Sequence, residues 1–257
     1  MNTLHLFGDS YTQGHHHEDG YPPYIEWKKI RGGILPKTWA ELLSEKLSMD
    51  LLNNAIAGSS NHEIFHTICQ ECDKFKKDDI VIVNWTYMHR FRWALEAIYD
   101  KNFYVKNRWK RSGMGKRIPG DDDEPSDEIK EKISVNRLNP LYVEEIYEYE
   151  KILNRLSESI GFDVYYWSAD NTIIHNLPQE LLHQKKYILH NLIIGNESRG
   201  LLDVILKNGG DTITIETKQK INDGHLGEIG HKIQADLFYD YITNLPPIPT
   251  PLPKKII

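Results

Sequence analysis

The amino-acid sequence predicts an α/β protein with a central parallel sheet covered by helices on both sides. Strand-like and helix-like stretches alternate along most of its 257 residues, and repeated alternation of this kind gives a parallel sheet between helices. The clearest strand contains residues 80–83, an apolar run entered from an acidic turn, as expected where both faces of a strand are buried. With 40% hydrophobic residues, the chain can bury the core of one such domain.

The expected elements follow one another in chain order. Strands are expected at residues 3–7, 50–55, 78–87 and 163–170, and helices at 38–47, 61–75, 142–162, 179–192 and 226–242. Residues 211–217 alternate like a strand, although an exposed hairpin edge would give the same pattern. In the closing helix, the spacing places four residues on one apolar face: Ile229, Ile233, Leu237 and Tyr241.

Capping signals indicate where two of the helices begin. Thr38 with Glu41, and Ser60 with Glu63, have the spacing of a capping box, in which each side chain bonds the other residue's backbone amide. The helix over 142–162 is expected to stop near Gly161.

Three regions fall outside the alternating pattern. Residues 14–37 read as a long loop, and residues 100–140 run from basic to acidic and predict an exposed insertion or lid. Residues 245–257 form a Pro-rich tail, which we expect to be extended or disordered. The organisation predicted is therefore a single domain over residues 1–244 with a charged insertion at about 100–140.

Composition excludes several classes of protein. The net charge of −6 and the mixture of both signs argue against a general nucleic-acid binder, which usually carries a basic excess. No apolar stretch is long enough to span a bilayer, and the N-terminus lacks the pattern of a signal peptide. We therefore expect a soluble protein of the cytoplasm or another intracellular compartment, without a membrane partner.

The cysteines and the consecutive histidines have ordinary interpretations. Cys69 and Cys72 form a lone C-x-x-C, and without a second pair we expect reduced thiols in a helix rather than a zinc site. His15, His16 and His17 are adjacent in the sequence, so their side chains point in different directions and a solvated loop is expected. We predict no metal and no cofactor.

Ser10 is the first candidate for chemistry. The apolar strand 3–7 stops at Gly8, and Asp9 and Ser10 follow at once, so Ser10 lies where ligands bind in parallel sheets. A serine nucleophile needs a nearby base and donors for the oxyanion it creates. The alternative is a simple turn or helix cap, which these residue types also favour.

Three segments of the sequence resemble a known family. "FGDS" near the N-terminus, "NNAIAGSSN" after the second strand and "DGHLGEIGH" before the last helix resemble three of the four blocks of the SGNH (GDSL-type) hydrolases. The resemblance implies a three-layer α/β/α sandwich like that of flavodoxin. It implies Ser10 as the nucleophile, Gly58 as an oxyanion-hole amide and His225 as the general base.

The chain departs from the family's third block, G-x-N-D, whose asparagine supplies an oxyanion donor. Here the corresponding strand end reads "VNWTYMHR". Candidates for that donor or for binding substrate are Asn84, Thr86, Tyr87 and Arg90, together with Asn61 beside the proposed oxyanion hole. Losing one donor outright commonly slows catalysis about 10²- to 10³-fold.

The last block also departs from the family pattern D-x-x-H. Asn222 stands where the family has its aspartate, and Asp223 lies two residues before His225. Either residue could orient the imidazole, but only a carboxylate stabilises the imidazolium that forms, so we favour Asp223. His231 fits the closing helix better than the site.

The function predicted is a serine-dependent hydrolase that cleaves carboxylic esters through an acyl-enzyme. Its substrate would be a small-molecule or carbohydrate ester, with a carbohydrate O-acetyl ester as one candidate. The alternative is a binding or assembly module that keeps the scaffold with weak or no catalysis, motivated by the missing third block. A nucleotide-binding protein is poorly supported, because the chain has neither G-x-G-x-x-G nor a P-loop. The oligomeric state is left open.

Overall fold

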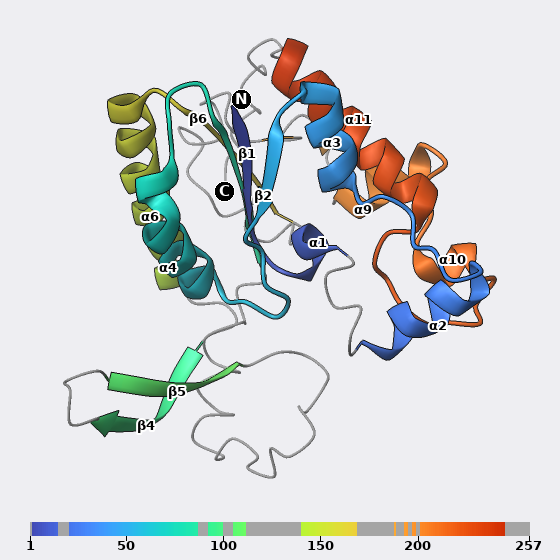
Figure 1. Cartoon of the computed structure of the whole chain (residues 1–257), viewed down its shortest axis with the longest axis horizontal. Helices are drawn as coiled ribbons and strands as arrows, with labels where there is room; N and C mark the ends of the chain where they lie inside the picture. Colours follow the sequence, from blue (N-terminus) through green and yellow to red (C-terminus); the bar gives the residue numbers. More distant parts are fainter. Residues whose placement is uncertain are drawn as a thin grey trace.

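A parallel sheet with the strand order β2-β1-β3-β6 forms the centre of the molecule (Figure 1). Its strands are Thr3–Phe7 (β1), Asp50–Asn53 (β2), Ile80–Trp85 (β3) and Asp163–Ser168 (β6). Leu4 of β1 lies opposite Leu51 on one side and Ile80 on the other. The computed structural model describes residues 2–14, 21–86, 92–99, 105–111, 140–168, 188, 193–194, 197–198 and 201–244.

Helices cover both faces of this sheet. These helices are Trp39–Leu47 (α3), Asn61–Glu71 (α4), Pro140–Ile160 (α6), Leu201–Lys207 (α9) and Glu228–Asn244 (α11). Helices α4 and α6 lie against one face, and α3, α9 and α11 lie against the other (Figure 1). The predicted α/β fold is confirmed.

Strand β3 shows why both helix layers are needed. Val81, Val83 and Trp85 are fully buried in the core shared with α4 and α6. Ile82, whose side chain points to the opposite face, is fully buried in the core shared with α3 and α11. A strand buried on both faces needs apolar side chains on both of them, which explains the continuous apolar run over residues 80–83.

Both predicted capping boxes are present. Thr38 bonds reciprocally with Glu41 at the start of α3, and Ser60 does so with Glu63 at the start of α4. Gly161, with φ +93°, follows the last residue of α6. This left-handed conformation suits glycine, so the predicted end of the helix is confirmed.

Two segments differ from the sequence prediction. Residues 14–37 were expected as a loop, but Pro22–Ile30 forms helix α2, with its two prolines in the first turn where no amide donor is needed. Residues 211–217 were expected as a strand, but Ile213–Glu216 forms the short helix α10, capped by Thr212. Helix α9 was not expected either.

The apolar face expected for the closing helix is also corrected. In α11 the buried side is formed by His231, Gln234, Ala235 and Phe238, whereas Ile229 is 49% exposed. The most buried positions therefore lie one or two residues away from the expected stripe. Ile233, Leu237 and Tyr241 are partly buried and do pack against the core, so the correction concerns Ile229 and the position of the most buried residues.

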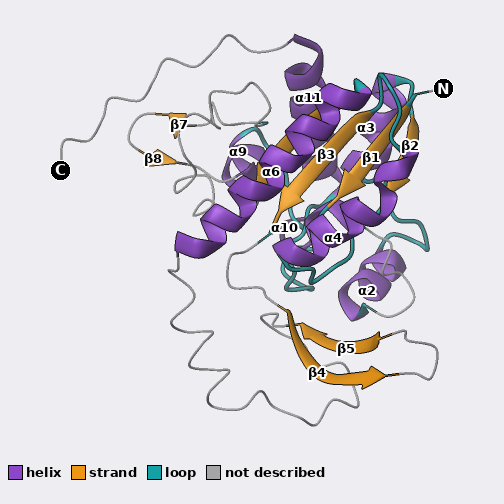
Figure 2. Cartoon of the chain, turned by 90° about the vertical axis from the view of Figure 1, so that its left-hand side faces the viewer, coloured by secondary structure: helices purple, strands orange, loops and turns teal. Residues whose placement is uncertain are grey.

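The segment after β3 contains a hairpin separate from the main sheet. Strands Arg92–Tyr99 (β4) and Val105–Arg111 (β5) pair antiparallel with each other (Figure 2). The rest of the predicted insertion, most of the helix expected at 179–192, the tail at 245–257 and the histidines at 15–17 lie outside the described residues. Cys69 and Cys72 carry free thiols. None of the described helices is long and apolar enough to cross a membrane.

A buried pair joins β1 to β3 at the edge of the sheet opposite Ser10. His5 Nε2 lies 3.2 Å from Asp79 Oδ2, and both residues are 1% exposed. Asp79 also accepts hydrogen bonds from the amides of Thr3 and Lys76. Burial lowers the pKa of His5 below its usual value, although Asp79 acts in the opposite direction.

The pair makes stability depend on pH in a defined direction. Because the folded chain resists protonation of His5 while the unfolded chain does not, stability is lost as the pH falls below about 6.5, the unfolded pKa of histidine. In His5→Gln, an amide donor for Asp79 remains but nothing titrates. The free energy of unfolding, measured with urea, should fall more between pH 7.5 and pH 5.0 in the unchanged protein than in His5→Gln. An equal fall in the two proteins would exclude His5 as the source of the pH dependence.

Candidate active site

Ser10 is the first residue of helix α1, Ser10–Gln13, directly after β1 at the carboxyl edge of the sheet (Figure 1). Gly8 makes the turn between strand and helix. A Cβ at Gly8 would lie 2.5 Å from Thr12 Oγ1 and 2.7 Å from Asn84 Cβ, so the close packing here requires glycine. Asp9 caps the helix, and its Oδ1 accepts a hydrogen bond from the Tyr11 amide at 3.0 Å.

Asp9 also ties this turn to the end of β3. Its side chain is fully buried, and Oδ1 accepts from Asn84 Nδ2 at 2.9 Å while Oδ2 accepts from Thr86 Oγ1 at 2.6 Å. The "GDS" segment is therefore a turn that caps a helix, which is the alternative that the sequence analysis gave beside a nucleophile. The same cap holds Ser10 in one position, so this interpretation is compatible with a nucleophile.

Asn61 extends the network to helix α4. Its Nδ2 donates to the Thr86 carbonyl at 3.1 Å, and its Oδ1 accepts from the Thr86 amide at 2.7 Å. Asn61, Asn84 and Thr86 are thus brought together, and each makes hydrogen bonds within the protein. Their role toward an oxyanion or substrate stays a prediction, and Tyr87 and Arg90 lie outside the described residues.

Gly58 lies in the turn between β2 and α4, with φ +75°. The side chain of Gln13 in α1 accepts a hydrogen bond from the neighbouring Ala57 amide at 2.6 Å, which holds this turn against α1. Within the described residues, the backbone amides of Ser10 and Gly58 donate to no protein acceptor. Their role as oxyanion donors stays a prediction.

The predicted histidine stands in the loop between α10 and α11. Asp223 Oδ1 lies 2.6 Å from His225 Nδ1 and also accepts from the His225 amide at 2.8 Å. The sequence offered Asn222 and Asp223 as partners of the imidazole, and the structure places Asp223 in contact with it. Residues of α10 fix the loop, since the Ile213 amide donates to the His225 carbonyl at 2.8 Å and Thr214 Oγ1 donates to the Asp223 carbonyl at 2.8 Å.

This contact determines which nitrogen of His225 can act as a base. A carboxylate at Nδ1 favours a proton on that atom and leaves the lone pair on Nε2. Nε2 is buried, and it has no hydrogen-bond partner among the described residues. The Tyr11 ring, one residue after Ser10, lies 5.0 Å from the His225 ring between centroids. His225 therefore lies next to the start of α1.

Asp223 carries a stabilised negative charge. Burial alone would raise the pKa of this carboxyl, but the hydrogen bonds and charge of His225, with a smaller contribution from the Tyr21 hydroxyl, bring the pKa below its usual value. Asp223 is consequently ionised at neutral pH. It can orient the imidazole and stabilise the imidazolium.

Tyrosine rings surround His225. Besides Tyr11, the rings of Tyr21 and Tyr24 lie 6.3 Å and 6.0 Å from it between centroids. Burial and the charge of Asp223 raise the pKa of both hydroxyls well above the usual value, so both stay neutral. Sequence reasoning missed them because it assigned residues 14–37 to a loop. The prolines that start α2 were the available signal.

An ion-pair cluster fixes α2 against the histidine loop. The guanidinium of Arg31 bonds Glu216 in α10 and Glu228 in α11. Glu216 also accepts from Trp27 Nε1 at 3.0 Å and from the Glu228 amide at 2.9 Å. Arg31 was not singled out from the sequence, since its partners lie far away in the chain.

Two further expectations concern His231 and metals. His231 is buried in α11, where its Nδ1 accepts from the Trp39 amide at 3.2 Å, as expected for a residue of the helix. Among the described residues, no group of three or more histidine, cysteine or acidic side chains could hold a metal ion.

A double-mutant cycle tests the Asp9 network. Asp9→Asn turns one acceptor of the buried carboxylate into a donor, which should lower the free energy of unfolding by about 1–3 kcal/mol. Thr86→Val removes the hydroxyl that donates to Oδ2. Chemical denaturation of both single variants and the double variant should reveal a coupling energy of about 0.5–3 kcal/mol. Additive losses would mean that the two side chains do not interact.

Comparison with solved structures gives distant likenesses. No family model and no curated protein sequence matches the chain. Among solved structures, a Desulfitobacterium hafniense protein described as lipolytic and of the G-D-S-L family is similar with a TM-score of 0.45 and 13% identity, over 94% of this chain and 99% of that one. The Bacillus subtilis protein YxiM is similar with a TM-score of 0.43 and 14% identity, over 95% of this chain and 56% of that one.

Proposed function

We propose that this chain is a serine-dependent hydrolase of the SGNH type, which cleaves carboxylic esters through an acyl-enzyme. The environment of His225 carries the proposal. Asp223 lies 2.6 Å from Nδ1 of the imidazole, while Nε2 has no partner among the described residues. The ring packs on that of Tyr11, the residue that follows Ser10 in the chain. The order of Ser10, Gly58 and Asp223–His225 along the chain, which resembles that family, supports it further.

In the proposed reaction, Ser10 Oγ attacks the carbonyl carbon of the ester while His225 Nε2 takes its proton. The negative charge that develops on the carbonyl oxygen is stabilised by hydrogen bonds from the Ser10 and Gly58 amides. The imidazolium, balanced by Asp223, then gives its proton to the leaving alkoxide. A water molecule then attacks the acyl carbon while Nε2 takes its proton, and the imidazolium returns that proton to Ser10 Oγ as the carbon–oxygen bond breaks, which releases the acid and restores the free serine.

Ser10 Oγ and His225 Nε2 are not hydrogen-bonded to each other in this structure. Within the described residues, Ser10 Oγ makes no hydrogen bond. Catalytic hydrogen bonds are often long or poorly aligned without substrate and tighten in the complex. Substrate binding against α1 is expected to bring Oγ and Nε2 together.

One observation favours the alternative, a binding module with weak catalysis. The amide of Asn84, the asparagine at the end of β3, donates to Asp9 and so is engaged inside the protein. If no other side chain replaces the family's third oxyanion donor, the rate falls about 10²- to 10³-fold. We expect slow turnover from two backbone amides, unless Tyr87 or Arg90 contributes.

The substrate proposed is a small carboxylic ester. Aromatic rings stack readily on the apolar faces of sugars, and Tyr11, Tyr21 and Tyr24 surround the base. A carbohydrate O-acetyl ester is therefore one candidate substrate.

Labelling with a fluorophosphonate tests the nucleophile. We expect one adduct on the purified protein, mapped to Ser10 by peptide mass spectrometry, because only a serine with a working base reacts readily. The adduct should be absent from Ser10→Ala and His225→Ala. His62→Ala, which changes an exposed histidine of α4, should label like the unchanged protein. A folded protein without label would favour the binding module.

Asp223→Asn tests the orientation of the base. The amide can still contact the imidazole but favours the wrong tautomer and does not stabilise the imidazolium, so kcat for a p-nitrophenyl ester should fall about 10⁴-fold. Circular dichroism and thermal unfolding of the variant check that the fold is kept. A loss of less than about tenfold would show that Asp223 does not act on His225 in the way that the triad requires.

A further inference from the structure

The carboxylate of Asp223 has one oxygen that the contacts with His225 do not use. Asp223 is 5% exposed, and its Oδ1 lies 2.6 Å from His225 Nδ1 and accepts from the His225 amide at 2.8 Å. Oδ2 is buried and accepts no hydrogen bond of ordinary geometry within the described residues. A buried oxygen of an ionised carboxylate is costly without a donor, so a donor is expected beside it.

The hydroxyl of Tyr21 lies beside this carboxylate. Burial raises the pKa of the Asp223 carboxyl, and the hydrogen bonds and charge of His225, with a smaller hydrogen-bond contribution from Tyr21, bring it below its usual value. Burial and Asp223 raise the pKa of the Tyr21 hydroxyl well above its usual value, so this hydroxyl keeps its proton. The Tyr21 ring also stands edge-on to the imidazole, with 6.3 Å between centroids. Since an ionised carboxylate only accepts hydrogen bonds, the hydroxyl is the donor of the two.

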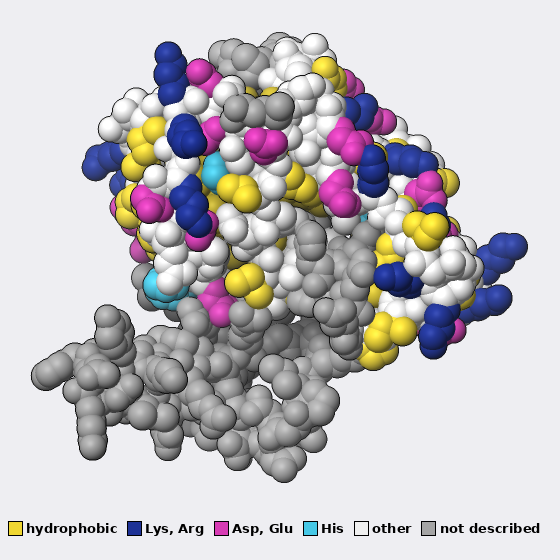
Figure 3. All heavy atoms as spheres, viewed as in Figure 1, with side chains coloured by type: hydrophobic (Ala, Val, Ile, Leu, Met, Phe, Trp, Pro, Cys, Tyr) yellow, Lys and Arg dark blue, Asp and Glu magenta, His cyan; other side chains and the backbone are white. Residues whose placement is uncertain are grey.

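Helix α2 brings Tyr21 to this position. Tyr21 is the N-cap of the helix, and the next two aromatic residues, Tyr24 and Trp27, are buried in a small core that includes Ile213 of α10. The outer side of the helix faces solvent, and lysine and arginine side chains gather at this edge of the surface (Figure 3). The aromatic side of α2 is therefore the one that packs against the histidine loop.

Helix α10 is bonded both to α2 and to the backbone of Asp223. On one side, Glu216 accepts from Trp27 Nε1 at 3.0 Å and pairs with Arg31. On the other side, Thr214 Oγ1 accepts from the Asp223 amide at 2.7 Å and donates to the Asp223 carbonyl at 2.8 Å. The place of the carboxylate relative to α2 is therefore set by contacts at both of its ends.

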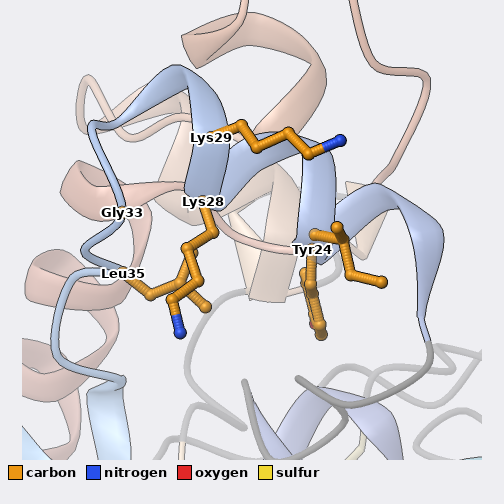
Figure 4. Close-up of a pocket in the computed structure, with 6 residues that line it drawn as sticks. Tyr24, Lys28, Lys29, Gly33 and Leu35 are labelled. Atoms are coloured by element: carbon orange, nitrogen blue, oxygen red, sulfur yellow. The ribbon is translucent and has the colours of Figure 1, made fainter.

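Tyr24 is the other tyrosine of α2 near the pair, and its surroundings differ. It is 3% exposed, its ring lies 5.0 Å from that of Tyr21 between centroids, and it lines a cleft together with Lys28 and Leu35 (Figure 4). Burial and the charge of Asp223 raise the pKa of the Tyr24 hydroxyl, whereas a hydrogen bond to Asp223 contributes to the shift in Tyr21. Tyr21 is therefore the better donor for the carboxylate.

From these observations we infer that Tyr21 is a positioning residue of the Asp223–His225 pair. Its hydroxyl donates to Asp223 Oδ2 and so stabilises the ionised carboxylate on which the base depends. As a statement about catalysis this rests on the proposed function. Tyr21 acts through Asp223 and touches neither the reacting atoms nor the nucleophile.

This role predicts a pH dependence with a definite sign. Because the hydroxyl stabilises the charged form of Asp223, its removal raises the pKa of that carboxyl. Asp223 and His225 titrate as a coupled pair, so activity that needs an ionised carboxylate and a neutral imidazole is lost at a higher pH. The other titratable groups around the pair are unchanged by the removal: Tyr11 of α1, Tyr24 of α2, and Glu216 of α10, which pairs with Arg31.

Tyr21→Phe tests the role in turnover, because it removes the hydroxyl and keeps the ring. With p-nitrophenyl acetate, the acidic limb of the pH profile of kcat/KM should move to higher pH. Well below that limb kcat/KM should fall about tenfold, whereas on the alkaline plateau kcat and KM should both stay unchanged. An unmoved limb, or an equal fall at every pH, would overturn the role of the hydroxyl.

A measurement without turnover tests the same contact in Ser10→Ala. The Cε1 proton of His225, identified by its absence from His225→Ala, is followed by NMR as the pH is lowered. Without the hydroxyl, more of the charge of Asp223 acts on the imidazole, so Tyr21→Phe should move the midpoint of this titration to higher pH. In the presence of Asp223→Asn it should move nothing. A midpoint that does not move, or that moves equally with Asp223→Asn, would overturn the inference.

The matched control is Tyr239→Phe, which removes the hydroxyl of a partly buried tyrosine of α11 that packs against Lys46. It should leave the pH profile and the histidine titration unchanged, and an equal shift in this control would overturn the inference. A midpoint moved by Tyr21→Phe in a protein that hydrolyses no ester would contradict the hydrolase alone. Hydrolysis with an unmoved limb and midpoint in Tyr21→Phe would contradict the role of Tyr21 alone.

Discussion

Asp9 carries a carboxylate with no exposure to solvent, and groups from two segments of the chain donate to it: the Tyr11 amide, Asn84 Nδ2 and Thr86 Oγ1. A buried carboxylate without donors would be costly, so the turn after β1 and the end of β3 must keep their positions. The constraint continues through Thr86, whose backbone is held by Asn61. The loops at the carboxyl edge of the sheet thus form one connected structure, and Ser10 is its first helical residue.

The other half of the site depends on helix α2. Arg31 and Trp27 reach Glu216, while Tyr21 and Tyr24 pack against the imidazole of His225. Exclusion of water by these rings strengthens the interaction between Asp223 and His225, because electrostatic forces grow as the local dielectric falls.

The sequence allowed the sheet and the capped helices to be predicted, since their signals are local. The apolar run of β3, the capping boxes at Thr38 and Ser60, and the glycine after α6 act within a few residues. The ion pairs of Arg31 were missed because its partners come from residues about 190 positions away, whereas helix α2 was missed although the prolines of its first turn gave a local signal. For the same reason, the engagement of Asn84 by Asp9 could not be foreseen, although Ser10, Gly58 and the Asp223–His225 pair could be named.

A crystal structure of the protein after reaction with a small fluorophosphonate tests the central claim most directly. We expect phosphorus bonded to Ser10 Oγ, with the phosphonyl oxygen about 2.7–3.1 Å from the Ser10 and Gly58 amide nitrogens and His225 Nε2 within hydrogen-bond reach of the adduct. Phosphorus on another side chain, or a phosphonyl oxygen directed away from both amides, would contradict it.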